Sequence, residues 1–208
     1  GLPVTSIAKN CFWVEFNLQS IHIPSSIENI DTQAFYRCTN LESITVHKSN
    51  KYYDSRNNSN AIINSYSNTL ILGCQNTTIP DTVTTIGVYA FQGCENLKSI
   101  SIPEGVKQIS MRAFEECKKL SSITIPDSVI TIQPSAFENC TELEYLYTSE
   151  SQKEKFALPS SLTSLGANAF AGCVKIGEVT IPGSVATLDS SAFANCTGLS
   201  TITLDEGV

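Results

Sequence analysis

The chain has 208 residues, of which 41% are hydrophobic and 16% are charged, and 13 Lys+Arg against 20 Asp+Glu give a net charge of -7. This composition is typical of an ordered protein rather than a disordered one. An acidic balance without a basic run argues against binding to the phosphates of a nucleic acid. No apolar stretch approaches the roughly 18–20 residues needed to span a membrane, and the N-terminus carries no signal-peptide pattern.

An internal repeat organises almost the whole sequence. The stretch IPEGVKQISMRAFEECKKLSSIT (102–124) is followed by IPDSVITIQPSAFENCTELEYLY (125–147), with the same pattern 23 residues on. The position that Val106 occupies in the first stretch and Val129 in the second holds an aliphatic residue in every repeat: Val4, Ile27, Val83, Val106, Val129, Leu162, Val185 and Val208. Seven of the nine phenylalanines share another slot: Phe12, Phe35, Phe91, Phe114, Phe137, Phe170 and Phe193. A repeat this short cannot bury its own apolar side, so the pattern predicts a stacked solenoid.

Each part of the repeat predicts a local structure. The segment L-x-x-I-x-I ends in the alternation of a half-buried strand, and the following proline ends that strand. The segment V-x-x-I-G predicts a turn, in which we expect Gly87 and Gly166 to adopt a positive φ. The segment A-F-x-x-C-x-x-L has apolar residues spaced three apart, which favours a short helical turn.

This pattern resembles the BspA-like leucine-rich-repeat family of bacterial surface proteins. The resemblance implies a right-handed leucine-rich-repeat solenoid of about eight turns of about 23 residues, with parallel strands on a concave face and short helical turns. It also implies a secreted or cell-surface location and a role in adhesion. We expect residues 1–208 to form a single solenoid domain. Because the chain starts within a repeat and stops at Val208, the first slot of another, we also expect a fragment of a longer protein.

Two segments depart from the repeat. Residues 48–82 predict a long repeat that carries a β-hairpin, with strands near 61–63 and 69–72, and an asparagine-rich turn before it. Residues 148–155, TSESQKEK, predict a polar loop insertion. That loop is either simply solvated or in contact with a ligand, since insertions in repeat proteins gather on one face.

The cysteines predict buried thiols rather than disulfides or a zinc site. Six of the eight share one repeat slot: Cys38, Cys94, Cys117, Cys140, Cys173 and Cys196. Equivalent side chains on successive turns run parallel at roughly 4.7–5 Å, whereas disulfide Cβ atoms converge to about 3.8 Å. We therefore expect a ladder of small buried thiols.

The sequence predicts neither a catalytic site nor a cofactor. Its two histidines, His22 and His47, could lie within one turn of each other, and a fortuitous metal contact is the alternative to ordinary surface histidines. No Ser-His-Asp arrangement, nucleophile elbow or phosphate loop is present.

The outward residues of the strand segment are the candidate binding surface. Most repeats place serine or threonine there, whereas one places Tyr145 and Tyr147. Tyrosine combines apolar area with a hydroxyl group and is enriched at interface hot spots. We expect the two rings to lie beside the outward residues of the neighbouring repeats, and the predicted binding residues are Ser122, Thr124, Tyr145, Tyr147, Glu178 and Thr180. The alternative is that the rings only pack under the insertion.

Together with the family resemblance, these features predict a non-catalytic, adhesin-like binding scaffold of a secreted or cell-surface bacterial protein, which recognises a host protein or an extracellular polysaccharide. The alternative is a structural spacer, a stalk that displays another domain.

Overall fold

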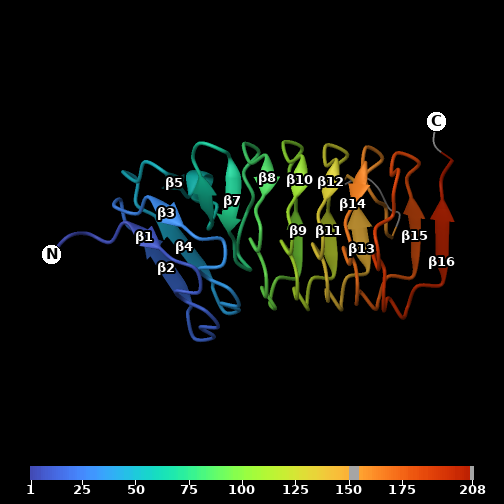
Figure 1. Ribbon diagram of the computed structural model, residues 1–208, viewed down its shortest axis with the longest axis horizontal. Coiled ribbons are helices and arrows are strands. Elements are labelled where there is room, and N and C mark those ends of the chain that lie inside the picture. The colour runs from blue at the N-terminus through green and yellow to red at the C-terminus, as the bar shows by residue number, and fades with distance from the viewer. Residues whose placement is uncertain (150–154, 207–208) are drawn as a thin grey trace.

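A computed structural model describes residues 1–149 and 155–206, and it is one elongated stack of chain turns with its termini at opposite ends (Figure 1). Each regular turn contributes a main strand, a second strand and a segment of tight turns, and these form three faces of the stack. The strands β1–β4 run at an angle to the strands of the later repeats (Figure 1).

The strands fall into three sets. The main-strand face contains β2 (Ser20–Ile23), β4 (Ser43–Val46), β9 (Ser99–Ser101), β11 (Ser122–Thr124), β13 (Tyr145–Tyr147), β15 (Glu178–Ile181) and β16 (Thr201–Leu204). The second-strand face contains β1 (Ser6–Ile7), β3 (Asn29–Ile30), β8 (Thr85–Ile86), β10 (Gln108–Ile109), β12 (Thr131–Ile132) and β14 (Ser164–Leu165). The long repeat adds β5 (Tyr53–Asp54), the 3-10 helix η1 (Arg56–Asn58), β6 (Ile62–Asn64) and β7 (Thr69–Leu72).

Successive repeats pair in parallel and in the register that the repeat predicts. Ile123 of β11 lies between Ile100 of β9 and Leu146 of β13. On the second-strand face, Ile109 of β10 lies between Ile86 and Ile132. The predicted parallel sheet is therefore confirmed.

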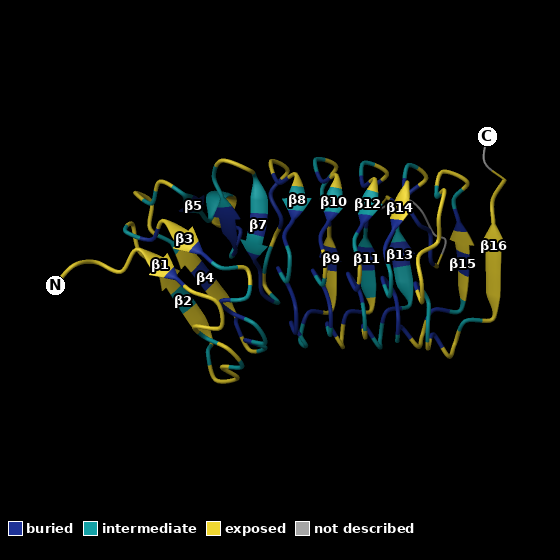
Figure 2. Cartoon of the chain, in the orientation of Figure 1, coloured by how far each residue is buried: buried dark blue, intermediate teal, exposed yellow. Residues whose placement is uncertain are grey.

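Stacked phenylalanine rings form the centre of the core. Neighbouring rings from Phe91 to Phe193 lie nearly parallel, with centroids 4.9–5.4 Å apart. Phe114 and Phe137 are fully buried, whereas every residue of the last strand, β16, is exposed. The same contrast between interior and end repeats is visible in Figure 2. Burial thus grows with the number of neighbouring repeats, as expected for a one-dimensional stack.

The predicted helical turn is wrong. Among the described residues, η1 is the only helix, and the A-F-x-x-C segments are successive tight turns, which we call the turn face. Within one segment, the Cys94 N–H donates to the Phe91 carbonyl at 3.0 Å. Other N–H groups bond to the next repeat instead, as Phe91 does to the Ala113 carbonyl at 2.7 Å.

Left-handed residues explain why this segment does not become a helix. Tyr89 and Gly93 have φ values of 62° and 70°. Arg112 and Glu116 repeat this arrangement in the next turn, with φ values of 57° and 59°. Residues with positive φ interrupt a right-handed helix, so alternate N–H groups point along the stack and bond to the neighbouring repeat.

The expected reason for glycine at positions 87 and 166 is also wrong, because neither residue has a positive φ. A Cβ atom on Gly87 would lie 2.5 Å from the Leu70 carbonyl oxygen, and one on Gly166 would lie 2.5 Å from the Pro134 nitrogen. Close approach of the neighbouring repeat therefore requires glycine at both positions.

The long repeat contains the predicted hairpin, in which β6 pairs antiparallel with β7. Asn57, Asn58 and Asn60, in the predicted asparagine-rich turn, have positive φ values. The strand β7 then pairs in parallel with β8 and continues the second-strand face.

The long repeat also separates two hydrophobic cores. One core contains Phe35 and the other contains Phe91. Side chains complete the hydrogen bonding at this boundary: the Tyr53 hydroxyl accepts the Ile30 N–H at 3.0 Å, and the Asn60 amide oxygen accepts the Ile44 N–H at 2.6 Å.

The slot cysteines are free and buried, as predicted. Their thiols also have a specific hydrogen-bonding role. Cys117 and Cys140 donate to the carbonyls of Phe91 and Phe114 of the preceding repeats, both at 3.1 Å. The cysteine slot therefore both fills space and ties one turn of the chain to the turn before it.

Candidate binding surface

The outward side of the main-strand face is a ladder of polar side chains. In β9 the central Ile100 is buried and the flanking Ser99 and Ser101 are exposed. In β11, Ile123 is buried while Ser122 and Thr124 are half-buried. The alternation arises because successive side chains of a strand point to opposite sides.

Tyr145 and Tyr147 place two aromatic rings on this ladder. Both are half-buried, and their ring centroids lie 6.0 Å apart with an interplanar angle of 19°. Tyr145 pairs in register with Ser122, and Tyr147 pairs with Thr124. The structure therefore brings four of the six predicted binding residues together.

The exit of the insertion separates the other two residues from the tyrosines. Leu146 forms a parallel bridge with Phe156, and Ala157 forms a parallel bridge with Thr180. The repeat predicted that Glu178 and Thr180 lie directly beside Tyr145 and Tyr147. This prediction is wrong, because Phe156 and Ala157 lie between the two strands. Residues 150–154 of the predicted loop lie outside the described residues.

Two shallow grooves flank the tyrosine strand. The first, of about 580 Å³, lies over β15 and β16 and is lined by Glu144, Lys155, Phe156, Lys175, Gly177, Glu178, Val179, Thr180, Ser200, Thr201 and Thr203. The second, of about 510 Å³, lies over β9 and β11 and is lined by Thr77, Thr78, Ile79, Asp81, Ser99, Ile100, Ser101, Pro103, Ser122, Ile123, Thr124 and Tyr147. Of the predicted binding residues, Ser122, Thr124 and Tyr147 thus line the second groove and Glu178 and Thr180 line the first. Tyr145 lines neither groove.

The first groove carries charges of both signs. The Lys155 ammonium lies 3.5 Å from a Glu144 carboxylate oxygen, and Lys175 forms an ion pair with Glu142. The hydrogen bond that Lys175 donates to the Glu142 carboxylate raises the pKa of Lys175 above its ordinary value. The lining combines Lys155 and Lys175 with Glu144 and Glu178, so this groove presents a mixed-charge surface rather than an anion or cation site.

The two histidines lie near each other on the N-terminal repeats. Their ring centroids are 6.3 Å apart, and His22 Nδ1 lies 2.9 Å from the Thr45 hydroxyl. In the part of the chain that the structure describes, no group of three or more His, Cys, Asp or Glu side chains could hold a metal ion. The same described residues contain no helix long and apolar enough to cross a membrane.

Comparison with known families identifies the repeat. The BspA type leucine rich repeat region matches residues 61–154 and 144–208, in six copies. The chain belongs to this family.

Solved structures of leucine-rich repeat proteins have the same fold. A protein from Eubacterium ventriosum is 29% identical, with a TM-score of 0.73 over 89% of this chain and 48% of that one. A protein from Bacteroides ovatus is 33% identical, with a TM-score of 0.57 over 73% of this chain and 39% of that one. A leucine rich cell surface protein from Faecalibacterium prausnitzii is 26% identical, with a TM-score of 0.63 over 97% of this chain and 57% of that one. The chain thus spans about half the length of these relatives, and no curated protein sequence matches it.

The BspA-type repeat pattern did not reveal all residues of the first groove. Lys155 and Phe156 enter it only because the insertion adds chain to the main-strand face. Thr201 and Thr203, by contrast, could be predicted from the repeat, because they occupy the same outward positions as Glu178 and Thr180 in the preceding strand.

Proposed function

We propose that the chain is a non-catalytic binding scaffold of a secreted or cell-surface bacterial protein, and that it recognises an extracellular protein or polysaccharide through its main-strand face. The right-handed winding and the concave position of that face, both implied by family membership, are part of this proposal. So is the organisation of residues 1–208 as a single solenoid domain within a longer protein.

The proposal rests on Tyr145 and Tyr147, which lie where Phe156 and Ala157 interrupt the main-strand sheet. Elsewhere the outward ladder is mostly small and polar, but here two stacked rings stand between two grooves. Aromatic rings with hydroxyl groups supply large contact area at low entropic cost, and such residues dominate interface energetics. The serines and threonines around them supply hydrogen bonds of either sense.

The proposed location draws on the relatives. The Faecalibacterium protein is described as a cell surface protein, and BspA-type repeats cover residues 61–208 of this chain. A ligand at the surface of a cell would be a protein or a polysaccharide.

A stalk that displays another domain is the second candidate function. The elongated, regular stack supports it, since the core runs without interruption from Phe91 to Phe193. A stalk needs no ligand on the main-strand face, which makes the two functions separable by experiment.

The test is binding of the chain to immobilised extracellular-matrix proteins and polysaccharides, measured by surface plasmon resonance. We expect the double variant Tyr145→Ser/Tyr147→Ser to lose at least about tenfold in affinity, equivalent to about 1.4 kcal/mol. The melting temperature should change little, because both rings are half-buried at the surface.

Ser20→Ala/Ser43→Ala is the matched control. Both serines are exposed outward residues of β2 and β4, remote from the tyrosine strand, so this variant should bind like the wild type. A large drop in melting temperature for the tyrosine variant would assign the rings to packing under the insertion. Absence of binding by the wild type to every immobilised ligand would favour the stalk.

A further inference from the structure

A second aromatic cluster lies on the turn face of the N-terminal repeats, away from the main-strand face. Trp13 and Tyr36 directly follow the slot residues Phe12 and Phe35, and Tyr89 lies two residues before Phe91. The Tyr36 and Tyr89 rings meet edge to face, with centroids 5.8 Å apart and an interplanar angle of 77°. The side chain of Trp13 is largely open to solvent, because the residue is 58% exposed.

The long repeat explains how these rings meet. Phe35 and Phe91 are 56 residues apart in sequence, but the turn segments that carry them touch directly. The Arg37 N–H bonds to the Gln92 side chain at 3.2 Å, and the Asn96 amide lies 3.4 Å from that of Asn40. A residue from the second repeat therefore packs against one from the fourth.

The rings line a shallow hollow of about 390 Å³ that also contains polar groups. Its lining residues are Lys9, Asn10, Trp13, Gln33, Tyr36, Tyr89 and Arg112. None of these side chains is aliphatic. The hollow thus combines aromatic faces with two side-chain amides, each of which can both donate and accept hydrogen bonds.

Nearby carboxylates balance the arginines. Arg37 lies over the Tyr36 ring, 5.7 Å from its centroid, and forms an ion pair with Glu116. Arg112 pairs with Glu115 at 2.9 Å. Of the two cations that line the hollow, Arg112 is thus paired with a carboxylate, and Lys9 has no ion pair among the described residues. The hollow therefore offers one unpaired positive charge rather than the cluster that would select an anionic ligand.

The same slots differ in later repeats. The residue after the slot phenylalanine is Gln92, Glu115, Glu138, Ala171 or Ala194. Two residues before the slot phenylalanine, the later repeats have Arg112, Ser135, Asn168 or Ser191. The repeat fold therefore does not require an aromatic residue in either slot, and the three rings are a local feature of this part of the turn face.

We propose that this hollow is a second binding site, for a neutral oligosaccharide. The C–H face of a pyranose ring packs against Trp13 and Tyr36, since aromatic side chains offer flat apolar area at low entropic cost. The sugar hydroxyls bond to the amides of Asn10 and Gln33, which can pair with a donor and an acceptor at once. A protein partner would be expected to use aliphatic contacts as well, and the net charge of -7 disfavours a nucleic acid.

Trp13 makes the test direct, because it is the only tryptophan of the chain. The probes are maltohexaose, cellohexaose and chitohexaose, titrated while the tryptophan emission is recorded. We expect a saturable change with at least one of them. The variant Tyr36→Ala should weaken that binding at least about tenfold, and Trp13→Ala should do the same when binding is measured by calorimetry.

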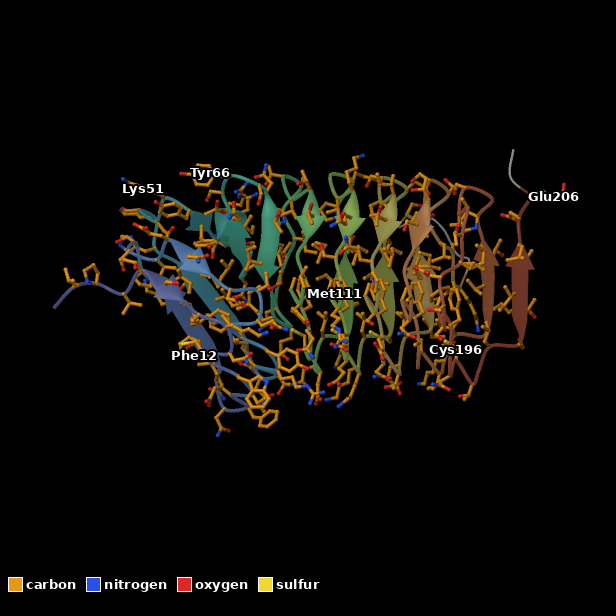
Figure 3. All side chains as sticks on the ribbon, viewed as in Figure 1. Phe12, Lys51, Tyr66, Met111, Cys196 and Glu206 are labelled. Carbon is orange, nitrogen blue, oxygen red and sulfur yellow. The ribbon has the colours of Figure 1, made fainter. Side chains whose placement is uncertain are left out.

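Tyr66→Ala is the matched control. Tyr66 is 74% exposed and lies at the opposite, upper edge of the molecule from Phe12, the neighbour of Trp13 (Figure 3). This variant should bind the sugar like the wild type. Circular dichroism confirms that each variant is folded, and Tyr89→Ala replaces Tyr36→Ala if that one is not.

Three results would overturn the proposal. The first is no saturable change with any of the three hexasaccharides. The second is unchanged affinity in the folded Tyr36→Ala or Tyr89→Ala protein. The third is an emission change with single-stranded oligothymidine alone, which would assign the hollow to nucleic acid stacking.

Discussion

The ring of Phe91 packs against the backbone of Gly73, at the level where other repeats supply a phenylalanine ring. A Cβ atom on Gly73 would lie 2.2 Å from Cε1 of that ring, and the Gly73 N–H donates to the Ala90 carbonyl at 2.8 Å. In the core that contains Phe91, the backbone of Gly73 therefore covers the N-terminal face of the phenylalanine stack. This contact is also the boundary at which the phenylalanine stack is interrupted.

Gly73→Ala should destabilise the fold by about 1–3 kcal/mol, the usual cost of forcing an extra methyl group into a packed core. Gly177→Ala is the control, because a Cβ atom there meets nothing within 4 Å. Urea unfolding of the two variants measures the difference. Equal stability of both would mean that Phe91 moves aside without cost.

The loss of unfolding free energy on replacing a phenylalanine by alanine should depend on the position of that phenylalanine in the stack. Phe114→Ala should cost about 3–5 kcal/mol through lost burial and cavity formation. Phe114 is fully buried and has a ring on either side, at 4.9 and 5.1 Å. Phe12 is only partly buried and has the Phe35 ring on one side at 5.3 Å, so Phe12→Ala should cost less. Equal losses of unfolding free energy would contradict the stacked, one-dimensional picture.

The repeat period predicted the parts of the fold that depend on burial. The register of Ile100, Ile123 and Leu146 follows from the spacing of apolar residues alone. So does the outward position of Tyr145 and Tyr147, because side chains alternate along a strand.

The parts that the period missed depend on backbone conformation and on contacts between distant residues. Arg112 and Tyr89 adopt positive φ in the turn face, and neither residue type signals this in a sequence. Phe156 lies in the main-strand face between β13 and β15, where it forms a bridge with Leu146, and the repeat pattern did not predict this position. The hollow around Tyr36 and Tyr89 was missed because the long repeat separates the two residues in sequence, and the sequence gives no sign that their rings meet.

The thiols should react in two classes. Cys11 is exposed, and the other seven cysteines are buried. Burial raises the pKa of Cys38 and of Cys196 to about 11, so little reactive thiolate forms at neutral pH. We expect one thiol to be alkylated rapidly in the folded protein and seven only after unfolding, as intact mass spectrometry without reductant can show.

Cys11→Ser should abolish the rapid class and leave the slow one unchanged. Disulfides in the unreduced protein, or several rapid thiols in the folded state, would contradict the buried ladder in which Cys117 and Cys140 donate to phenylalanine carbonyls.

The buried Glu115 should make stability depend on pH. Its side chain is 8% exposed and lies 2.9 Å from Arg112 and 3.4 Å from the Gln92 amide. Burial raises the pKa of Glu115 above its ordinary value of 4.5, while Arg112 acts in the opposite direction. The folded state therefore favours the protonated carboxyl more than the unfolded state does. The stability that this group contributes is fully present below the ordinary pKa and is lost as the pH rises through the raised one.

Glu115→Gln keeps the shape of the protonated side chain but cannot ionise. Relative to the wild type, this variant should therefore gain stability as the pH rises from about 4 to about 7. Unfolding free energies from urea titrations of both proteins at several pH values measure the difference. The sign of the pH dependence distinguishes the two effects. If Arg112 stabilised the carboxylate, the unfolding free energy of the variant would fall relative to the wild type as the pH rises. A difference that stays constant over this range would mean that burial and the arginine cancel at Glu115.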